Sequence, residues 1–248
     1  MELTNLIATG KSSEVYRCGD QAVKVFSPNT SKVDVLLEAL NTARVEDTGL
    51  YLPGINEVTM IDGRWAIVMN YVEGKTLASV MKEDPEHTEE YINKMVDIQL
   101  NIQSKRSPLL NKLKDKLKDQ IKSLTCIDDI VKYELLTRLD GMPKHDKVCH
   151  GDFEPRNILL SGDNYYTLDW IHASQGNASA DVARTYLLLA LNNIDTANMY
   201  MEIFCKKTNT KKQYVQQWLP IVAAAQLTKN KPEEKELLMQ WINVVEYE

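Results

Sequence analysis

The segment from residue 150 to residue 157 carries the most specific chemistry in this sequence. It reads HGDFEPRN, so that four residues separate Asp152 from Asn157. This is the spacing of loops that transfer phosphoryl groups. In such a loop the Asp carboxylate accepts the proton of an attacking hydroxyl, and the Asn amide oxygen ligates a Mg²⁺ ion held against the phosphates. Pro155 stiffens the turn between them. Taken alone, the spacing also fits an ordinary surface loop.

A second carboxylate follows shortly afterwards. Residues 165–170 read YYTLDW and place Asp169 at the end of an apolar strand. Because Mg²⁺ prefers carboxylate oxygens together with phosphate and water, we expect Asp169 to be a second metal ligand beside Asn157. An isolated Asp at a strand end is more often a turn or cap residue. Its position just after the Asp152 loop, with a hairpin between, favours the metal.

A lysine near the N-terminus has the surroundings of a phosphate ligand. Lys24 ends the run AVK in a β-branched stretch, and Glu38 lies in the middle of the helix expected next. In phosphoryl-transfer enzymes a strand lysine contacts the α- and β-phosphates and pairs with a helix glutamate. Glu46 is a poorer partner because it lies near the helix end. Each residue by itself also fits a solvated surface position.

The turn at residues 9–16, TGKSSEVY, stands where a phosphate-covering loop would be needed. Backbone N–H groups and the hydroxyls of Ser12 and Ser13 could donate to phosphate oxygens. The turn has one glycine and does not match the G-x-x-x-x-G-K-[ST] pattern. A plain hairpin turn fits the same residues.

The elements around these residues are of two kinds. Short strands are expected at residues 3–8, 15–18 and 21–26, followed by a helix capped by Thr30 or Ser31, and then by a hairpin of residues 55–61 and 65–69 around Asp62-Gly63. In that helix Val33, Leu36, Leu37 and Leu40 recur at helical spacing. After Gly74, helices are expected at residues 76–82, 86–105, 109–124 and 127–139, then a strand pair at 158–160 and 165–168, and helices from 180 onward. The pattern predicts an α+β protein with a β-rich lobe, residues 1–72, and a larger helical lobe, residues 73–248.

In this order the segments resemble the aminoglycoside phosphotransferase and choline-kinase-like family of small-molecule kinases, over essentially the full length of the chain. The resemblance rests on AVKVF at 22–26, IVMNYVEGKTL at 67–77, HGD and NILL at 150–160, and DWI at 169–171 running on to DVART at 181–185. HGD in place of HRD, DW in place of DFG, and the absence of an APE segment separate the sequence from protein kinases.

The resemblance implies a protein-kinase-like fold with two lobes, a small antiparallel sheet with one helix and a larger mainly helical lobe. It implies ATP, with GTP left open, and Mg²⁺ as cofactors. The roles that it implies are Lys24 on the phosphates, Glu38 as its partner, Asp152 as catalytic base, and Asn157 and Asp169 as Mg²⁺ ligands. His150 would pack the loop, Asp181 would hold it by hydrogen bonds, and Met69 to Tyr71 would meet the adenine through backbone groups.

Three features depart from the family pattern. Glu154 stands where protein kinases carry a phosphate-binding lysine, which leaves charge neutralisation to Mg²⁺ and Lys24. Asn177-Ala178 replaces the frequent Asp-Pro, and the nucleotide loop is poor in glycine. None of these changes removes one of the expected catalytic groups.

Composition narrows the remaining possibilities. The 248 residues carry a net charge of −6, which argues against a nucleic-acid-binding surface and is compatible with a cationic substrate. The four cysteines form no C-x-x-C pair, and we expect reduced thiols. The N-terminus has no signal-peptide pattern and no apolar run is long enough for a membrane span, so we expect a cytoplasmic protein without a membrane partner.

The expected function is therefore ATP-dependent transfer of a phosphoryl group to a hydroxyl of a small molecule, such as an aminoglycoside, an amino alcohol or a sugar. Carboxylates at Glu83-Asp84 and Glu246 to Glu248 are candidates for binding a cationic acceptor, although solvated ends fit them as well. Trp170, Trp218 and Trp241 could line its pocket or be plain core. A catalytically silent nucleotide-binding module and, less readily, a protein kinase are the alternatives, and the sequence leaves the acceptor and the oligomeric state open.

Overall fold

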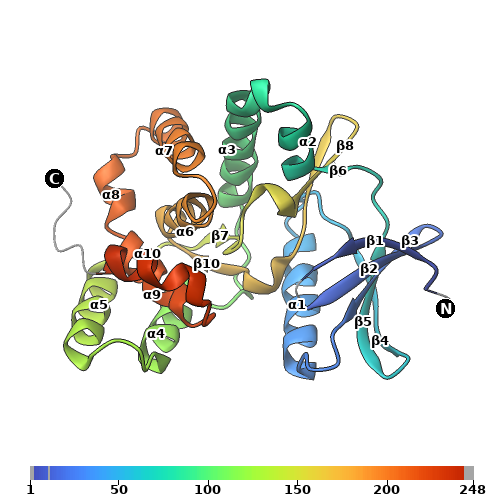
Figure 1. Cartoon of the computed structure of the whole chain (residues 1–248), viewed down its shortest axis with the longest axis horizontal. Coiled ribbons are helices and arrows are strands. Elements are labelled where there is room, and N and C mark those ends of the chain that lie inside the picture. Colours follow the sequence, from blue (N-terminus) through green and yellow to red (C-terminus); the bar gives the residue numbers. More distant parts are fainter. Residues whose placement is uncertain (1–2, 11, 243–248) are drawn as a thin grey trace. The chain divides into compact units, whose positions relative to one another are not determined.

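The computed structural model describes residues 3–10 and 12–242, and its contacts group the chain into two compact units (Figure 1). Unit 1 comprises Met1–Glu83 and Pro155–Ala173, and unit 2 comprises Asp84–Glu154 and Ser174–Glu248. The expected division into a nucleotide-binding lobe, residues 1–72, and a helical lobe with the catalytic loop and substrate site, residues 73–248, remains a prediction. The compact units differ from them because the segment after Glu154 folds with the N-terminal residues.

Unit 1 contains a five-stranded antiparallel sheet with one helix packed on it, as expected. In spatial order its strands are β1 (Asn5–Thr9), β2 (Ser13–Cys18), β3 (Gln21–Phe26), β5 (Arg64–Asn70) and β4 (Ile55–Ile61), and the helix is α1 (Lys32–Glu46). Both residues of the β4–β5 turn have positive φ, 49° for Asp62 and 74° for Gly63. This is the mirror-image turn that an Asp-Gly pair favours, so the predicted hairpin is confirmed.

The alternation of side chains along β3 decides where its lysine points. Val23 and Val25 lie in one core cluster with residues of β5, and Phe26 lies in a second cluster with Val35 of α1. Since successive side chains of a strand point to opposite faces, Lys24 shares the face of Phe26 and is directed toward α1. The strand pattern thus positions a buried cation under the helix.

Helix α1 confirms its predicted start but buries a different face from the one that its apolar spacing suggests. Ser31 is the N-cap, and its hydroxyl accepts a hydrogen bond from the Asp34 N–H at 3.1 Å. Val33, Leu36 and Leu40 are 72%, 43% and 47% exposed. The buried face of α1 includes Glu38, whose charge must meet Lys24 rather than water.

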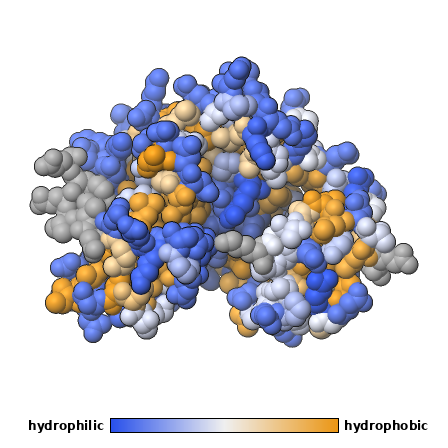
Figure 2. All heavy atoms as spheres, viewed as in Figure 1, coloured by the Kyte–Doolittle hydropathy of each residue, from blue (hydrophilic) through white to orange (hydrophobic). Residues whose placement is uncertain are grey.

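Apolar side chains also reach the surface at the edge strand of this sheet. Leu6 and Ile7 of β1 are 50% and 44% exposed, and Figure 2 shows apolar atoms gathered over this part of unit 1.

The rest of unit 1 contains the end of the predicted catalytic loop and the segment that follows it. It consists of β6 (Lys75–Thr76), α2 (Leu77–Glu83), the 3-10 helices η2 (Pro155–Asn157) and η3 (Trp170–His172), and the hairpin β8 (Ile158–Ser161) and β9 (Asn164–Thr167). Strand β6 pairs with β8, and a Cβ at Gly74 would lie 2.1 Å from the carbonyl oxygen of Leu160. Only glycine permits this approach. The Asn41 side chain on α1 donates to the carbonyl of Ile171 at 3.0 Å, which joins η3 to α1.

Unit 2 is mainly helical. Its helices are α3 (Thr88–Ser104), α4 (Leu113–Ser123), α5 (Asp129–Gly141), α6 (Ala178–Ala190), α7 (Ile194–Thr208), α8 (Lys212–Gln216), α9 (Leu219–Leu227) and α10 (Pro232–Ile242), with the 3-10 helix η1 (Pro85–His87) and the short strands β7 (Lys147–Cys149) and β10 (Ser174–Gly176). Every residue of α9 is buried, and α9 packs against α4, α6 and α10. Asn177, in place of the frequent Asp, caps α6 by accepting from the Ser179 N–H at 2.9 Å.

Candidate active site

Three predicted residues of unit 1 meet in one charged cluster. The Lys24 Nζ lies 2.6 Å from Glu38 Oε1 and 3.8 Å from Asp169 Oδ1. The Lys24 and Glu38 side chains are 15% and 7% exposed. Glu46 is excluded as the partner because its Oε1 accepts from the Ile55 N–H at 2.7 Å, at the beginning of β4.

The charges of this cluster favour the protonated form of Lys24. Burial on its own would lower the pKa of Lys24, but the nearby carboxylates of Glu38 and Asp169 outweigh burial and raise it. Burial raises the pKa of Glu38, against the opposing effect of Lys24. Lys24 is therefore a firmly protonated ammonium group, which is the form that a phosphate needs.

Asp169 and Asn157, the predicted Mg²⁺ ligands, both lie in unit 1 and carry oxygen donors of the kind that Mg²⁺ binds. Asp169 adopts a left-handed backbone conformation, with φ of 62°, at the start of η3. Its Oδ1 is buried and has no hydrogen bond from the described residues. The Leu168 N–H donates to the carbonyl of Asn157 at 2.9 Å, which joins the two ligand positions. Within residues 3–10 and 12–242 no cluster of three or more His, Cys, Asp or Glu side chains could hold a metal. A Mg²⁺ ion at Asn157 and Asp169 would thus complete its shell with phosphate oxygens and water, as Mg²⁺ prefers.

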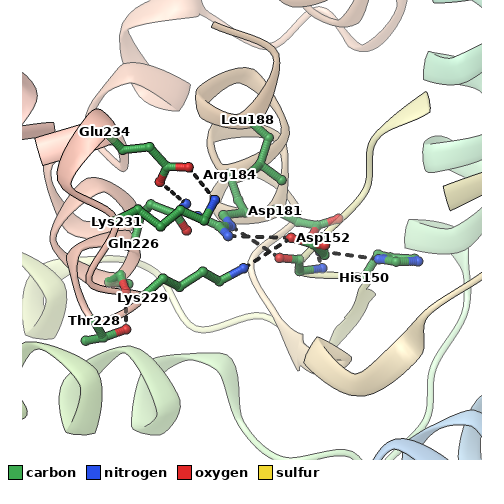
Figure 3. Close-up of polar contacts among 12 residues, drawn as sticks. His150, Asp152, Asp181, Arg184, Leu188, Gln226, Thr228, Lys229, Lys231 and Glu234 are labelled. Carbon is green, nitrogen blue, oxygen red and sulfur yellow. Dashed lines mark hydrogen bonds and ion pairs between the residues drawn. The ribbon is translucent and has the colours of Figure 1, made fainter. Parts of the chain in front are cut away.

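The part of the candidate catalytic loop that belongs to unit 2 contacts its neighbours as the resemblance implies (Figure 3). Gly151, with φ of 80°, donates its N–H to Asp181 Oδ1 at 2.8 Å. His150 is fully buried, its ring lies 5.7 Å from that of Phe153, and its Nδ1 accepts from the Asp152 N–H at 3.3 Å. The loop-holding contact of Asp181 and the packing role of His150 are confirmed.

Sequence reasoning missed two cations beside the Asp152 carboxylate. Arg184 Nη2 and Lys229 Nζ lie 3.6 Å and 3.5 Å from the same oxygen, Asp152 Oδ1. Figure 3 shows both side chains directed at this carboxylate. Arg184 could have been found, because it follows Asp181 by three positions and shares its face of α6. No pattern in the sequence connects Lys229 to the loop.

The Lys229 backbone is fixed by the turn between α9 and α10. Asn230 takes a left-handed conformation with φ of 49°. Glu234, at the beginning of α10, accepts from the Gln226 amide and pairs with Lys231 (Figure 3). These contacts on either side of Lys229 set the direction in which its side chain leaves the turn.

The other predicted nucleotide residues lie at a turn and at a strand end. The carbonyls of Ser12 and Ser13 accept from Ser27 and Gly10, both at 2.8 Å, in the β1–β2 connection. Met69 lies in β5, and the N–H of Tyr71, just beyond it, donates to the carbonyl of Asp20 at 2.9 Å. The Tyr71 N–H therefore already has a hydrogen-bond acceptor within the protein. A contact of Met69 and Tyr71 with adenine remains a prediction.

The acidic residues proposed for a cationic acceptor are engaged elsewhere. Glu83 pairs with Lys75 at 2.7 Å, and Asp84 bonds His87 and Tyr91, each at 2.8 Å. Glu246 to Glu248 lie outside the described residues.

The three tryptophans singled out in the sequence behave mainly as core. Trp170 and Trp218 are 1% and 0% exposed, as plain core residues would be. Trp241 lies with its ring 6.2 Å from that of Tyr186.

Comparison with known families decides the classification. A profile of the phosphotransferase enzyme family matches residues 4–204. The chain belongs to this family. The matched region of this phosphotransferase includes Lys24, Asp152 and Asp169. It ends before Lys229, the second cation beside Asp152.

Solved structures agree with the expected kinase-like fold. Aminoglycoside phosphotransferase APH(4)-Ia, in a ternary complex with AMP-PNP and hygromycin B, is 12% identical with a TM-score of 0.68, covering 95% of this chain and 88% of that one. Aminoglycoside-3′-phosphotransferase of type VIII is 14% identical with a TM-score of 0.67, covering 91% and 92%. Choline kinase LicA from Streptococcus pneumoniae is 14% identical with a TM-score of 0.66, covering 98% and 92%.

At such identities the shared property is the fold. No curated protein sequence matches the chain. Among the described helices of this phosphotransferase, none has both the length and the apolar character required to cross a bilayer.

Proposed function

We propose that this phosphotransferase transfers the γ-phosphoryl group of ATP to a hydroxyl of a small molecule. The observation that carries the proposal is the buried Lys24–Glu38 ion pair, 2.6 Å long, whose lysine also reaches Asp169 at 3.8 Å. A cation and a carboxylate at these positions are the parts that hold a nucleotide and its metal in kinases. The complex of APH(4)-Ia with AMP-PNP supports the choice of an adenine nucleotide.

Each residue has one task in the transfer. Lys24 would bind the α- and β-phosphates, and Asn157 and Asp169 would hold Mg²⁺, which neutralises phosphate charge when bound. Asp152 would orient the acceptor hydroxyl and accept its proton as the new oxygen–phosphorus bond forms and the bond to the β-phosphate oxygen breaks. Positioning and charge neutralisation then account for most of the rate acceleration.

Two alternatives predict different behaviour. A silent nucleotide-binding module would not require Asp152 in addition to Lys24, Asn157 and Asp169, and all four are present. A protein kinase would need an activation segment, whereas only η3 and β10 lie between Asp169 and the beginning of α6. The acceptor classes that the resemblance suggests are an aminoglycoside, an amino alcohol and a sugar-like alcohol.

The test is Asp152→Asn, which keeps the shape of the side chain and removes its ability to accept a proton. We expect acceptor-dependent ADP release to fall by about 100-fold or more, as for loss of a general base. Titration with Mg·ATP should show nearly unchanged nucleotide affinity, since Lys24, Asn157 and Asp169 are intact. Near-normal turnover of the variant would refute the role of Asp152, and failure of the wild type to bind Mg·ATP would refute the proposal as a whole.

A further inference from the structure

Three cations gather around Asp152 in unit 2. Arg184 of α6 and Lys229 of the α9–α10 turn reach the same carboxylate oxygen, at 3.6 Å and 3.5 Å. Lys116 of α4 is the third: its pKa is lowered to about 8, first by burial and then by the charges of Arg184 and Lys229. Burial and the charge of Arg184 likewise lower the pKa of Lys229. The charges of both other cations therefore act on Lys116, and the charge of Arg184 acts on Lys229.

The other carboxylates of this region are either buried or held by fixed hydrogen-bond and ion-pair partners. Asp181 accepts from Gly151 and from Gln99, at 2.8 Å and 3.0 Å. Glu234 is bound by Lys231 and Gln226, and Glu154 is 8% exposed. The charges of Asp152, Glu154 and Glu234 act on Arg184 and oppose the lowering of its pKa by burial. For Lys229, by contrast, the charges of Arg184 and Lys231 oppose that of Asp152.

The charge that remains accessible at Asp152 is positive. The side chain of Lys229 is 32% exposed, against 12% for Arg184 and 9% for Asp152 itself. A molecule that approaches the Asp152 carboxylate therefore meets the ammonium group of Lys229. A cationic molecule would be repelled by it and by Arg184, whereas an anion would relieve the mutual repulsion of the cations and form charge-assisted hydrogen bonds.

We propose that the acceptor carries an anionic group, a carboxylate or a phosphate, which is bound by Lys229 together with Arg184 while the acceptor hydroxyl faces Asp152. This inference rests on the proposed function and specifies its acceptor. It reverses the expectation of a cationic acceptor, which came from the net charge of the whole chain. It assigns binding to Lys229, a residue beyond the family match at residues 4–204.

Acceptors with a shared carbon skeleton and different charges test this proposal. One set is glycerate, glycerol and 3-amino-1,2-propanediol, and a second is glucose 6-phosphate, glucose and glucosamine. Acceptor-dependent ADP release and calorimetric binding, both with saturating Mg²⁺ nucleotide, should favour the anionic member of at least one set by about 10-fold or more, as for a charge-assisted hydrogen bond. Glycerol 3-phosphate, compared with glycerate on the same three-carbon skeleton, distinguishes a phosphate from a carboxylate. Equal or better use of the neutral or cationic members would overturn the inference, as would the absence of binding by either anion.

Lys229→Gln provides the second test, with Lys235→Gln, an exposed lysine of α10, as the matched control. Lys229→Gln should lower the preference for the anionic over the neutral acceptor, measured as the ratio of their kcat/KM values, by about 10-fold or more. Any effect that acts through Asp152 is common to both acceptors and cancels in this ratio. Lys229→Arg should retain the preference for the anion, and Lys235→Gln should behave as wild type. If Lys229 only neutralised Asp152, the Gln variant would instead change turnover of all acceptors alike.

The outcomes also separate this inference from the proposed function. Efficient phosphorylation of a cationic or neutral acceptor would refute the anionic subsite and leave the phosphotransferase activity standing. A wild-type protein that does not bind Mg·ATP would refute both.

Discussion

The ion pair between Lys24 and Glu38 can be tested by Glu38→Gln, which retains the size of the side chain and removes its charge. Coulomb attraction falls inversely with distance, so Glu38 at 2.6 Å attracts Lys24 about 1.5 times as strongly as Asp169 does at 3.8 Å. Breaking a buried ion pair from one side costs about 3–5 kcal/mol. Because Asp169 remains and Lys24 is 15% exposed, we expect the free energy of unfolding to fall by about 2–3 kcal/mol.

The measurement is guanidinium unfolding followed by circular dichroism and tryptophan fluorescence, for wild type, Glu38→Gln, Lys24→Met and the double variant. The double variant should lose less than the sum of the single variants, with a coupling of about 2 kcal/mol, since neither charge is then left alone. ATP affinity should fall in all three variants. Single effects that add to within about 0.5 kcal/mol would refute the reasoning.

Two further predictions concern packing and pH. Gly74→Ala should destabilise the protein by about 2 kcal/mol or more in the same unfolding assay, because the added Cβ would meet the Leu160 carbonyl oxygen at 2.1 Å; an unchanged midpoint would contradict this contact. The pKa of Lys116 is about 8 in the folded protein, against an ordinary value of 10.5. Between pH 8 and pH 10.5 the Lys116 side chain is therefore protonated in the unfolded chain and mostly neutral in the native one. The contribution of Lys116 to stability is therefore least favourable below pH 8 and improves as the pH rises to 10.5, by at most about 3 kcal/mol. Lys116→Met should lose that pH-dependent gain relative to wild type, and parallel stability curves would exclude the lowered pKa.

The sequence predicted the local structure of unit 1 well, because short-range signals determine it. The β-branched run of residues 21–26 is strand β3, and Asp62-Gly63 is the hairpin turn. Ser31 caps α1. The buried face of α1 was not predicted by its apolar spacing, because the charge of Glu38 faces the sheet and the more apolar stripe is left at the surface.

Long-range contacts explain what the sequence could not predict. Strand β8 joins unit 1 by pairing with β6, and this pairing cannot be seen in either segment by itself. Lys229, the second cation beside Asp152, was missed for a similar reason, because only the α9–α10 turn brings it to the loop. The spacing of Asp152 and Asn157 indicated the chemistry, and the surroundings of Asp152 supply the evidence on the acceptor.

The central claim is that this phosphotransferase moves a phosphoryl group from ATP to a hydroxyl of a small molecule through Asp152. Mass spectrometry of the acceptor, after incubation with Mg·ATP and wild-type protein or Asp152→Asn, tests it most directly. The account predicts a phosphate monoester of a small hydroxy compound that forms in equal amount with ADP and is absent with the variant. ADP formation without any phosphorylated small molecule, or equal product from the variant, would contradict it.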